Sequence, residues 1–181
     1  MAEPFSVDFP VRDKLLPFKD NIVKGYYEAW ANDKDGGRGY SREYFNDEIK
    51  RIVEPLWMEA LNYHFHPLPK SADKFRMFVY IQNHRTNRAV WHNHPEAELN
   101  AVFYLDAPKR GGELELLTVE PSGAIFEKQK LKVEDNKLYI MPFWTYHRPL
   151  PQEDTLDRVC FNIQYHTQNK KRLTQRNGIF W

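Results

Sequence analysis

Two histidines separated by one residue, His92 and His94, are the residues whose type and spacing most directly indicate chemistry. They lie in AVWHNHPEAELNAVFYL, where a proline and acidic residues separate two apolar stretches. If a strand continues through both histidines, their rings leave the same face, with backbones about 7 Å apart. Imidazole is the commonest metal ligand and suits zinc, copper, iron and nickel. The pair indicates half of a metal site, or else two solvated or hydrogen-bonded histidines.

His147 is the candidate for a third ligand. It follows an apolar stretch in IMPFWTYHRPLP. If that stretch is a strand beside the segment of His92 and His94, His147 would complete a set of three metal ligands on one face of the ion. The other histidines fit structural or solvated roles: His64 and His66 lie at the end of an expected helix, His84 lies in a turn, and His166 follows the last strand.

Arg158 opens RVCFNIQY and lies on the more polar face of this expected strand, with Asn162 and Gln164. A guanidinium in that place can offer two parallel hydrogen bonds to a carboxylate. The alternative interpretation is a surface ion pair with Asp157 or Glu153.

Tyr104 lies on the polar face of its own expected strand, together with Glu98 and Asn100. Its hydroxyl can add a hydrogen bond to the carboxylate that Arg158 would hold. Ordinary packing inside a barrel explains Tyr104 equally well.

The elements that must position these residues follow from the hydrophobic periodicity. Apolar residues recur every four positions in 18–30, and again in 45–61 around Pro55, which predicts two helices with a kink or two abutting helices at the proline. From residue 75 the period becomes two. The expected strands are 75–82, 88–94, 98–105, 112–117, 124–133, 137–142, a short piece around His147 and 158–165.

Leading helices followed by about eight strands predict a mainly β (α+β) fold, a closed double sheet such as a jelly roll with helices packed on one side. We expect one domain over 1–181: a helical part in 1–70, a barrel core in 75–165 and a basic tail in 166–181. In such a barrel inward and outward faces alternate along every strand, so the parity of each residue is itself a prediction.

The composition excludes several classes of protein. A net charge of +1 argues against a nucleic-acid partner or an anionic membrane surface, and QNKKRLTQR near the C-terminus is expected to be a solvated tail. The single Cys160 excludes an internal disulfide, and MAEPFSVDFP lacks the pattern of a signal peptide. We therefore expect a soluble, cytoplasmic protein.

These motifs, taken in order, resemble the iron(II)- and 2-oxoglutarate-dependent oxygenases. HNHPEAELNAVFYLDAPKRGGELELL is similar to the central motif of that family, and KLYIMPFWTYHRPLP with DRVCFNIQY is similar to its second half. The resemblance covers about 75–165. In the commonest form the second ligand is an acid, whereas His94 stands there in this chain, as in a small branch with an H-x-H-P motif.

The resemblance implies a double-stranded β-helix that binds Fe(II), 2-oxoglutarate and O2. It implies iron ligands His92, His94 and His147, or a shifted set in which His94 and Glu96 serve with His147. It further implies that Arg158, helped by Tyr104, holds the far carboxylate of 2-oxoglutarate. The expected reaction hydroxylates an unactivated C–H of a small molecule, amino acid or peptide and releases succinate and CO2.

Two other interpretations stay open. HNHPEAE and the spacing from Pro142 to His147 also resemble the cupin motifs, whose metal site would add Glu98 to the three histidines. The cupin glycines are missing, because Asn136 and Trp144 stand in their places. The second interpretation is a non-catalytic double-sheet binding module.

Overall fold

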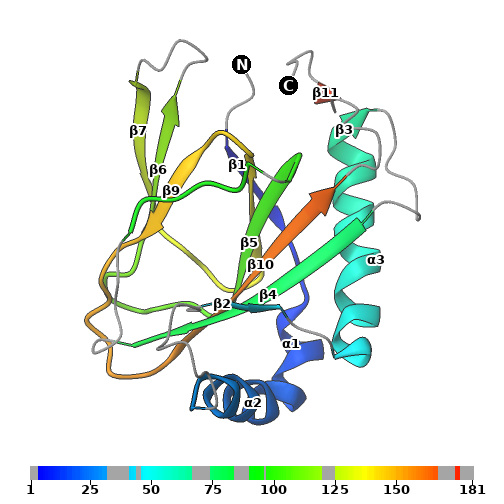
Figure 1. Cartoon of the computed structure of the whole chain (residues 1–181), viewed down its shortest axis with the longest axis vertical. Coiled ribbons are helices and arrows are strands. Elements are labelled where there is room, and N and C mark those ends of the chain that lie inside the picture. Colours follow the sequence, from blue (N-terminus) through cyan, green and yellow to red (C-terminus); the bar gives the residue numbers. More distant parts are fainter. Residues whose placement is uncertain are drawn as a thin grey trace.

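Antiparallel strands form two facing sheets, and helices lie along the outer side of one of them (Figure 1). This computed structural model describes residues 4–31, 41–43, 46–66, 74–83, 90–95, 97–119, 125–166 and 174–175. The helices are α1 (Arg12–Leu15), the 3-10 turn η1 (Leu16–Phe18), α2 (Lys19–Ala31) and α3 (Asp47–His64). The strands are β1 (Phe5–Asp8), β2 (Ser41–Glu43), β3 (Phe65–His66), β4 (Lys74–Gln82), β5 (Leu99–Asp106), β6 (Leu114–Val119), β7 (Ile125–Leu131), β8 (Lys137–Pro142), β9 (Tyr146–Pro149), β10 (Arg158–His166) and β11 (Thr174–Gln175).

The strand order is that of a double-stranded β-helix. The larger sheet has the order β1-β8-β5-β10-β4-β2, and the smaller sheet has the order β7-β6-β9. An isolated antiparallel bridge between His92 and His147 adds the segment before β5 to the open edge of β9. The predicted fold class, mainly β with N-terminal helices on one sheet, is confirmed.

The alternation along the strands separates two cores. On β10, Val159, Phe161, Ile163 and Tyr165 belong to the core between the larger sheet and the helices. Cys160 instead belongs to the core between the two sheets, with residues such as Tyr104 of β5. The predicted parity of β5 and β10 is therefore confirmed, and the polar residues of β10 share the inward face with Cys160.

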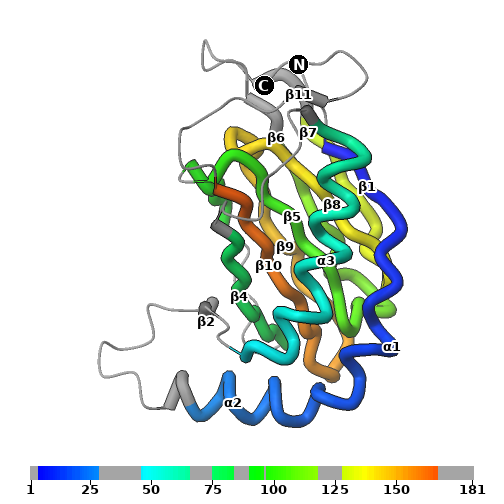
Figure 2. Tube along the Cα trace, turned by 90° about the vertical axis from the view of Figure 1, so that its right-hand side faces the viewer, coloured from blue at the N-terminus to red at the C-terminus, as the bar shows by residue number. Residues whose placement is uncertain are grey.

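α3 lies across the outer face of the larger sheet, and α2 lies at one end of that sheet (Figure 2). The side chain of Asn46 caps α3 by accepting hydrogen bonds from the backbone N–H groups of Glu48 and Ile49, at 3.0 and 3.1 Å. One face of α3 is buried at every fourth residue, through Ile49, Val53, Trp57 and Leu61.

α3 continues through Pro55, so the alternative of two abutting helices is wrong. Pro55 is exposed, and its missing N–H removes a hydrogen bond on the solvent side, where backbone groups find water. In α2 the expected residues Ile22 and Tyr26 are buried. The glycine-rich segment NDKDGGRG, which follows Ala31 at the end of α2, lies outside the described residues.

Several elements differ from the prediction. The strand expected in 88–94 is reduced, within the described part of that range, to the single bridge at His92. β1 pairs with β8 and was not predicted. Thr174–Gln175, part of the expected solvated tail, pairs with β3.

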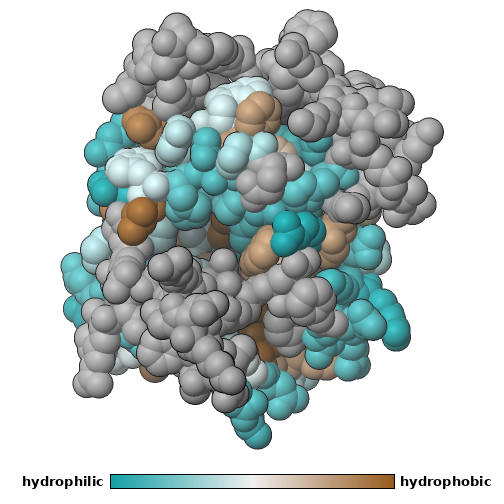
Figure 3. Space-filling model, viewed as in Figure 1, coloured by the Kyte–Doolittle hydropathy of each residue, from teal (hydrophilic) through white to brown (hydrophobic). Residues whose placement is uncertain are grey.

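The described surface is largely hydrophilic in the view of Figure 3, with hydrophobic residues scattered over it. None of the described helices combines the length and the apolar composition that crossing a membrane requires.

Candidate metal centre

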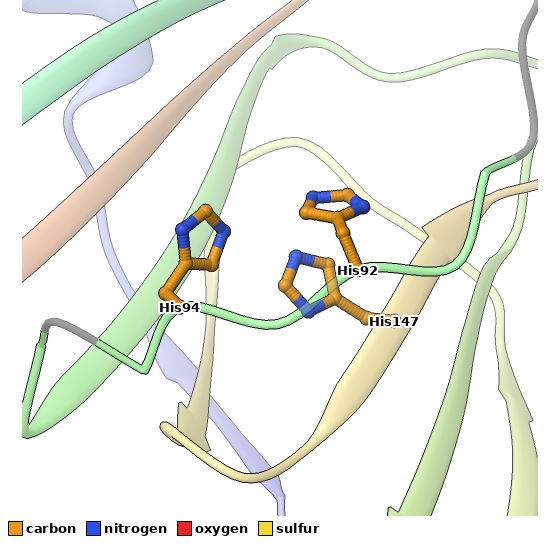
Figure 4. A group of neighbouring side chains, drawn as sticks. All are labelled: His92, His94 and His147. Atoms are coloured by element: carbon orange, nitrogen blue, oxygen red, sulfur yellow. The ribbon is translucent and has the colours of Figure 1, made fainter.

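Three imidazole rings converge between the two sheets, as Figure 4 shows for His92, His94 and His147. One nitrogen of each ring lies within 4.8 Å of a nitrogen of each other ring. The ring centroids of His92 and His147 are 4.3 Å apart, and His94 lies 5.3 and 5.2 Å from them. Among the described residues, this is the one group of three or more His, Cys, Asp or Glu side chains that can hold a metal ion.

Backbone hydrogen bonds fix two of the rings. His92 N–H donates to His147 O at 3.1 Å, and His147 N–H donates to His92 O at 2.8 Å. The Nδ1 atom of His92 lies 3.0 Å from Val90 O, and that of His147 lies 3.3 Å from Thr145 O. A carbonyl oxygen only accepts, so each Nδ1 carries the proton and each Nε2 keeps its lone pair for a metal.

His147 is the most buried of the three histidines, with 3% of its surface exposed, whereas His92 is exposed. Burial, and then the neighbouring imidazoles of His92 and His94, lower the pKa of His147 well below its ordinary 6.5. His147 is therefore neutral at pH 7, the form that binds metals.

His94 is held differently. Its Nδ1 atom lies 2.8 Å from Nε2 of Gln164, a side chain of β10 that is 2% exposed. The contact ties the segment before β5 to the inward face of the larger sheet.

The three rings fit a cation of the zinc and iron class. Metal–imidazole bonds of about 2.1 Å require ligand nitrogens about 3 Å apart. One ligand atom from each ring lies within 4.8 Å of the others, so small side-chain rotations would bring the three nitrogens to the spacing that an ion requires. Neutral nitrogen ligands suit divalent first-row metals and do not suit calcium or magnesium.

The other predicted ligands stand apart from this group. Glu98 is described and is not part of it, so the cupin set gains no support. Glu96 lies outside the described residues, and the shifted ligand set with Glu96 stays a prediction. His64 packs its ring at 5.0 Å from Phe5, and burial lowers its pKa, as expected of a structural histidine. His84 and the side chain of His66 are not described.

Arg158 lies inside the barrel, 1% exposed, so the alternative of a surface ion pair is wrong. Its Nη1 donates to Gly112 O at 3.0 Å and to Leu150 O at 3.4 Å, and its Nη2 contacts Oε1 of Gln82. The described residues offer it no carboxylate, and its Nε–H is buried without a hydrogen-bond partner. A buried cation with a spare donor is suited to a bound anion.

Gly112 permits this approach of the guanidinium to the backbone. Its φ is +71°, and a Cβ atom there would lie 2.4 Å from Cγ of Pro108 and 3.1 Å from Nη1 of Arg158. The second glycine of PKRGG is therefore required by the loop that covers Arg158.

Tyr104 is 2% exposed on the inward face of β5. Burial raises the pKa of its hydroxyl, Cys160 raises it further, and the positive charge of Arg158 acts in the opposite direction. Tyr104 therefore stays protonated and lies close enough to Arg158 to feel its charge.

No protein-family model and no curated protein sequence matches the chain. Solved structures do match. A prolyl-4-hydroxylase from Pseudomonas putida superposes with a TM-score of 0.59 at 12% identity, over 91% of this chain and 88% of that one. SnoK, a non-heme alpha-ketoglutarate-dependent carbocyclase from nogalamycin biosynthesis, gives 0.62 at 9% identity over 97% and 83%. The chain has the fold of the iron(II)- and 2-oxoglutarate-dependent oxygenases.

A prolyl 4-hydroxylase from Phytophthora capsici also shares this oxygenase fold, with a TM-score of 0.59 and 13% identity. The match covers 92% of this chain but 59% of the Phytophthora protein, which extends well beyond it. At such identities the likeness concerns the fold alone.

Within the oxygenase fold, one feature near the triad was not predicted from the sequence. The Arg148 guanidinium lies 4.5 Å above the Trp91 ring, and its Nε donates to Glu115 at 2.6 Å. Lys128 adds a second ion pair to Glu115 at 2.8 Å, and both cations lower the pKa of this carboxyl group. We call Trp91, Arg148, Glu115 and Lys128 the outer clamp. The outer clamp joins Trp91, which precedes His92, to Arg148, which follows His147. These residues are far apart in the sequence, and the register of the strands brings Arg148 opposite Glu115.

Proposed function

We propose that this chain is an iron(II)- and 2-oxoglutarate-dependent oxygenase that hydroxylates an unactivated C–H bond of a small molecule, amino acid or peptide. In this reaction one oxygen atom of O2 enters the substrate and the other enters succinate, while the first carboxylate of 2-oxoglutarate leaves as CO2. The observation that carries the proposal is the convergence of three histidines inside this fold, two of them with Nδ1 held by carbonyl oxygens.

His92, His94 and His147 would hold the iron and leave positions open for other ligands. Bound iron(II) supplies the activation of O2 that is coupled to loss of CO2 from 2-oxoglutarate. The residues of the chain would provide the placement: the buried, neutral His147 would hold the ion from inside the barrel, and a substrate would approach from the side of the more exposed His92.

Arg158 is the residue that would hold the far carboxylate of 2-oxoglutarate. It is bonded to the carbonyl of Leu150, three residues beyond His147 on the same chain segment. Three extended residues span about 10 Å. A five-carbon dicarboxylate with a metal bond of about 2 Å at one end and a hydrogen bond of about 3 Å at the other covers a similar length.

The test is turnover of the purified chain with iron(II), 2-oxoglutarate and O2 in the presence of candidate amino acids, peptides and small metabolites. We expect succinate release that depends on oxygen and is stimulated by one substrate class. The product should be heavier than the substrate by one oxygen atom, about 16 mass units. His147→Ala should abolish the release, whereas Glu98→Ala should keep it. Oxygen-independent or absent succinate release in the iron-loaded protein would overturn the proposal.

A further inference from the structure

The side chain of Gln164 lies between two imidazole rings on the inward face of β10. Its Nε2 atom is 2.8 Å from Nδ1 of His94, and its Oε1 atom is 3.2 Å from Nε2 of His166, two residues further along the strand. Gln164 is 2% exposed, so this amide is enclosed by protein. One side chain therefore joins a member of the triad to a histidine outside it.

This contact distinguishes His94 from the other two histidines. The Nδ1 atoms of His92 and His147 face backbone carbonyl oxygens, which can only accept. The Nδ1 atom of His94 faces an amide, which presents either an NH2 donor or a carbonyl acceptor. The tautomer of His94 is therefore set by the orientation of a side chain that can turn over.

The observed orientation disfavours coordination by Nε2 of His94. With the NH2 of Gln164 donating to Nδ1, the single proton of a neutral His94 sits on Nε2, where it occupies the lone pair a metal needs. If the amide reverses, Oε1 accepts from Nδ1–H and Nε2 becomes free to coordinate. The same reversal turns the NH2 toward His166, which must then accept at Nε2 and carry its proton on Nδ1.

We propose that Gln164 is a positioning residue for His94 and that its amide reverses when a metal ion binds, which changes the tautomer of His166. Each imidazole keeps one proton throughout, because each proton moves from Nε2 to Nδ1 of the same ring through exchange with water. The inference deepens the proposed function, since it rests on the same metal centre, but it does not require oxygenase turnover.

Substitutions at Gln164 separate its possible roles. Gln164→Glu supplies a group that accepts from Nδ1–H of His94 in either orientation, so it should bind metal at least as tightly as the wild-type chain. Gln164→Leu has a similar size and neither donor nor acceptor, so metal affinity should fall about 10- to 100-fold, as for other lost ligand-orienting groups. Asn162→Asp is the matched control: Asn162 lies on the same face of β10, and its amide donates to Asn100 at 2.6 Å rather than to a histidine.

The experiment is long-range 1H–15N NMR of the histidine side chains in the full chain, with and without zinc, a diamagnetic ion that binds imidazole. On addition of zinc we expect His94 to show Nδ1–H with Nε2 coordinated, and His166 to change from Nε2–H to Nδ1–H. In Gln164→Leu the His166 resonances should no longer respond, and in Asn162→Asp they should respond as in wild type.

The outcomes distinguish this inference from the proposed function. If zinc shifts His92, His94 and His147 while His166 keeps its tautomer, the role of Gln164 is overturned and the metal centre stands. If zinc leaves the three histidines unchanged, both proposals fail. The wild-type measurement decides the question even if Gln164→Leu does not fold.

Discussion

At the scale of single residues, the candidate chemistry depends on which nitrogen each histidine offers. His92 and His147 have Nδ1 held by backbone oxygens, and His147 is kept neutral by burial. The three histidines were recognisable in the sequence because an H-x-H pair and a third histidine after an apolar stretch have the spacing of metal ligands. Gln164 was recognisable only as a member of the polar face, because its contact with His94 depends on how the chain turns before β5.

Replacement of Arg158 tests its assignment to the co-substrate. Arg158→Lys keeps the positive charge but loses the planar fork, and Arg158→Ala loses both. Arg158→Ala loses a charge-assisted hydrogen bond of about 1.5–3 kcal/mol, so the apparent KM for 2-oxoglutarate should rise about 10- to 100-fold. Metal affinity, measured by titration, should change little. An unchanged KM in a folded Arg158→Ala protein would show that another residue binds the carboxylate.

The lowered pKa of His147 predicts how the stability of the metal-free chain depends on pH. Above about 6.5 both the folded and the unfolded chain hold this ring neutral. As the pH falls from 6.5 toward the lower pKa of the folded state, only the unfolded chain takes up the proton, so the free energy of unfolding decreases, by at most about 1.4 kcal/mol per pH unit.

Thermal unfolding of wild type and His147→Gln between pH 7 and pH 5 measures this effect. The variant should lose less stability over the window. His64, whose pKa is also lowered, is present in both chains, and Glu115 acts at lower pH because its pKa lies below 4.5. Parallel pH profiles for the two proteins would contradict the account of His147.

At the scale of elements, the alternation of period two located the long strands well. β4, β5, β8 and β10 are interior strands with one face on each core, so their patterns are regular. β1 was missed because four residues at a sheet edge carry little pattern. In the described residues 90–94 the expected strand is reduced to a bridge at His92, and the pair with His147 and the outer clamp hold this segment.

The outer clamp should therefore affect metal binding from a distance. Trp91→Leu removes a cation–π contact of about 0.5–2 kcal/mol, so His92 is less well ordered and zinc affinity should fall about 2- to 30-fold. Tyr63→Leu, an exposed aromatic residue of α3, is the control and should leave affinity unchanged. If Trp91→Leu lowers Tm without weakening zinc binding, the clamp serves the fold alone.

The interior proline of α3 predicts a stabilising substitution. Pro55→Ala restores a backbone N–H at an exposed helix position and should add about 2 kcal/mol to the free energy of unfolding, after the greater freedom of the unfolded alanine chain is deducted. A chain of this size should gain about 4–8 °C in Tm. Glu59→Ala, exposed on the same helix, should give almost no change. A Tm that does not rise would indicate that Pro55 sits without strain.

At the scale of the whole molecule, one core fixes the larger sheet against the helices and the other closes the space between the sheets. The second core holds the predicted site: the triad lies between the sheets, and Arg158 and Tyr104 lie on the inward faces of β10 and β5. The sequence predicted this architecture because inward and outward positions alternate with a fixed period. It did not predict the identity of the substrate, because loops rather than strands determine specificity in such folds.

We propose that His92, His94 and His147 bind iron(II) together with 2-oxoglutarate held by Arg158. Anaerobic titration of the chain with iron(II) and then 2-oxoglutarate measures this directly, through the visible charge-transfer band of a chelated 2-oxo acid. We predict a band in wild type and in Glu98→Ala, and no band in His147→Ala. In Arg158→Ala the band should form only at a much higher concentration of 2-oxoglutarate. A wild-type protein that binds iron without forming the band, or a band that survives His147→Ala, would contradict the account.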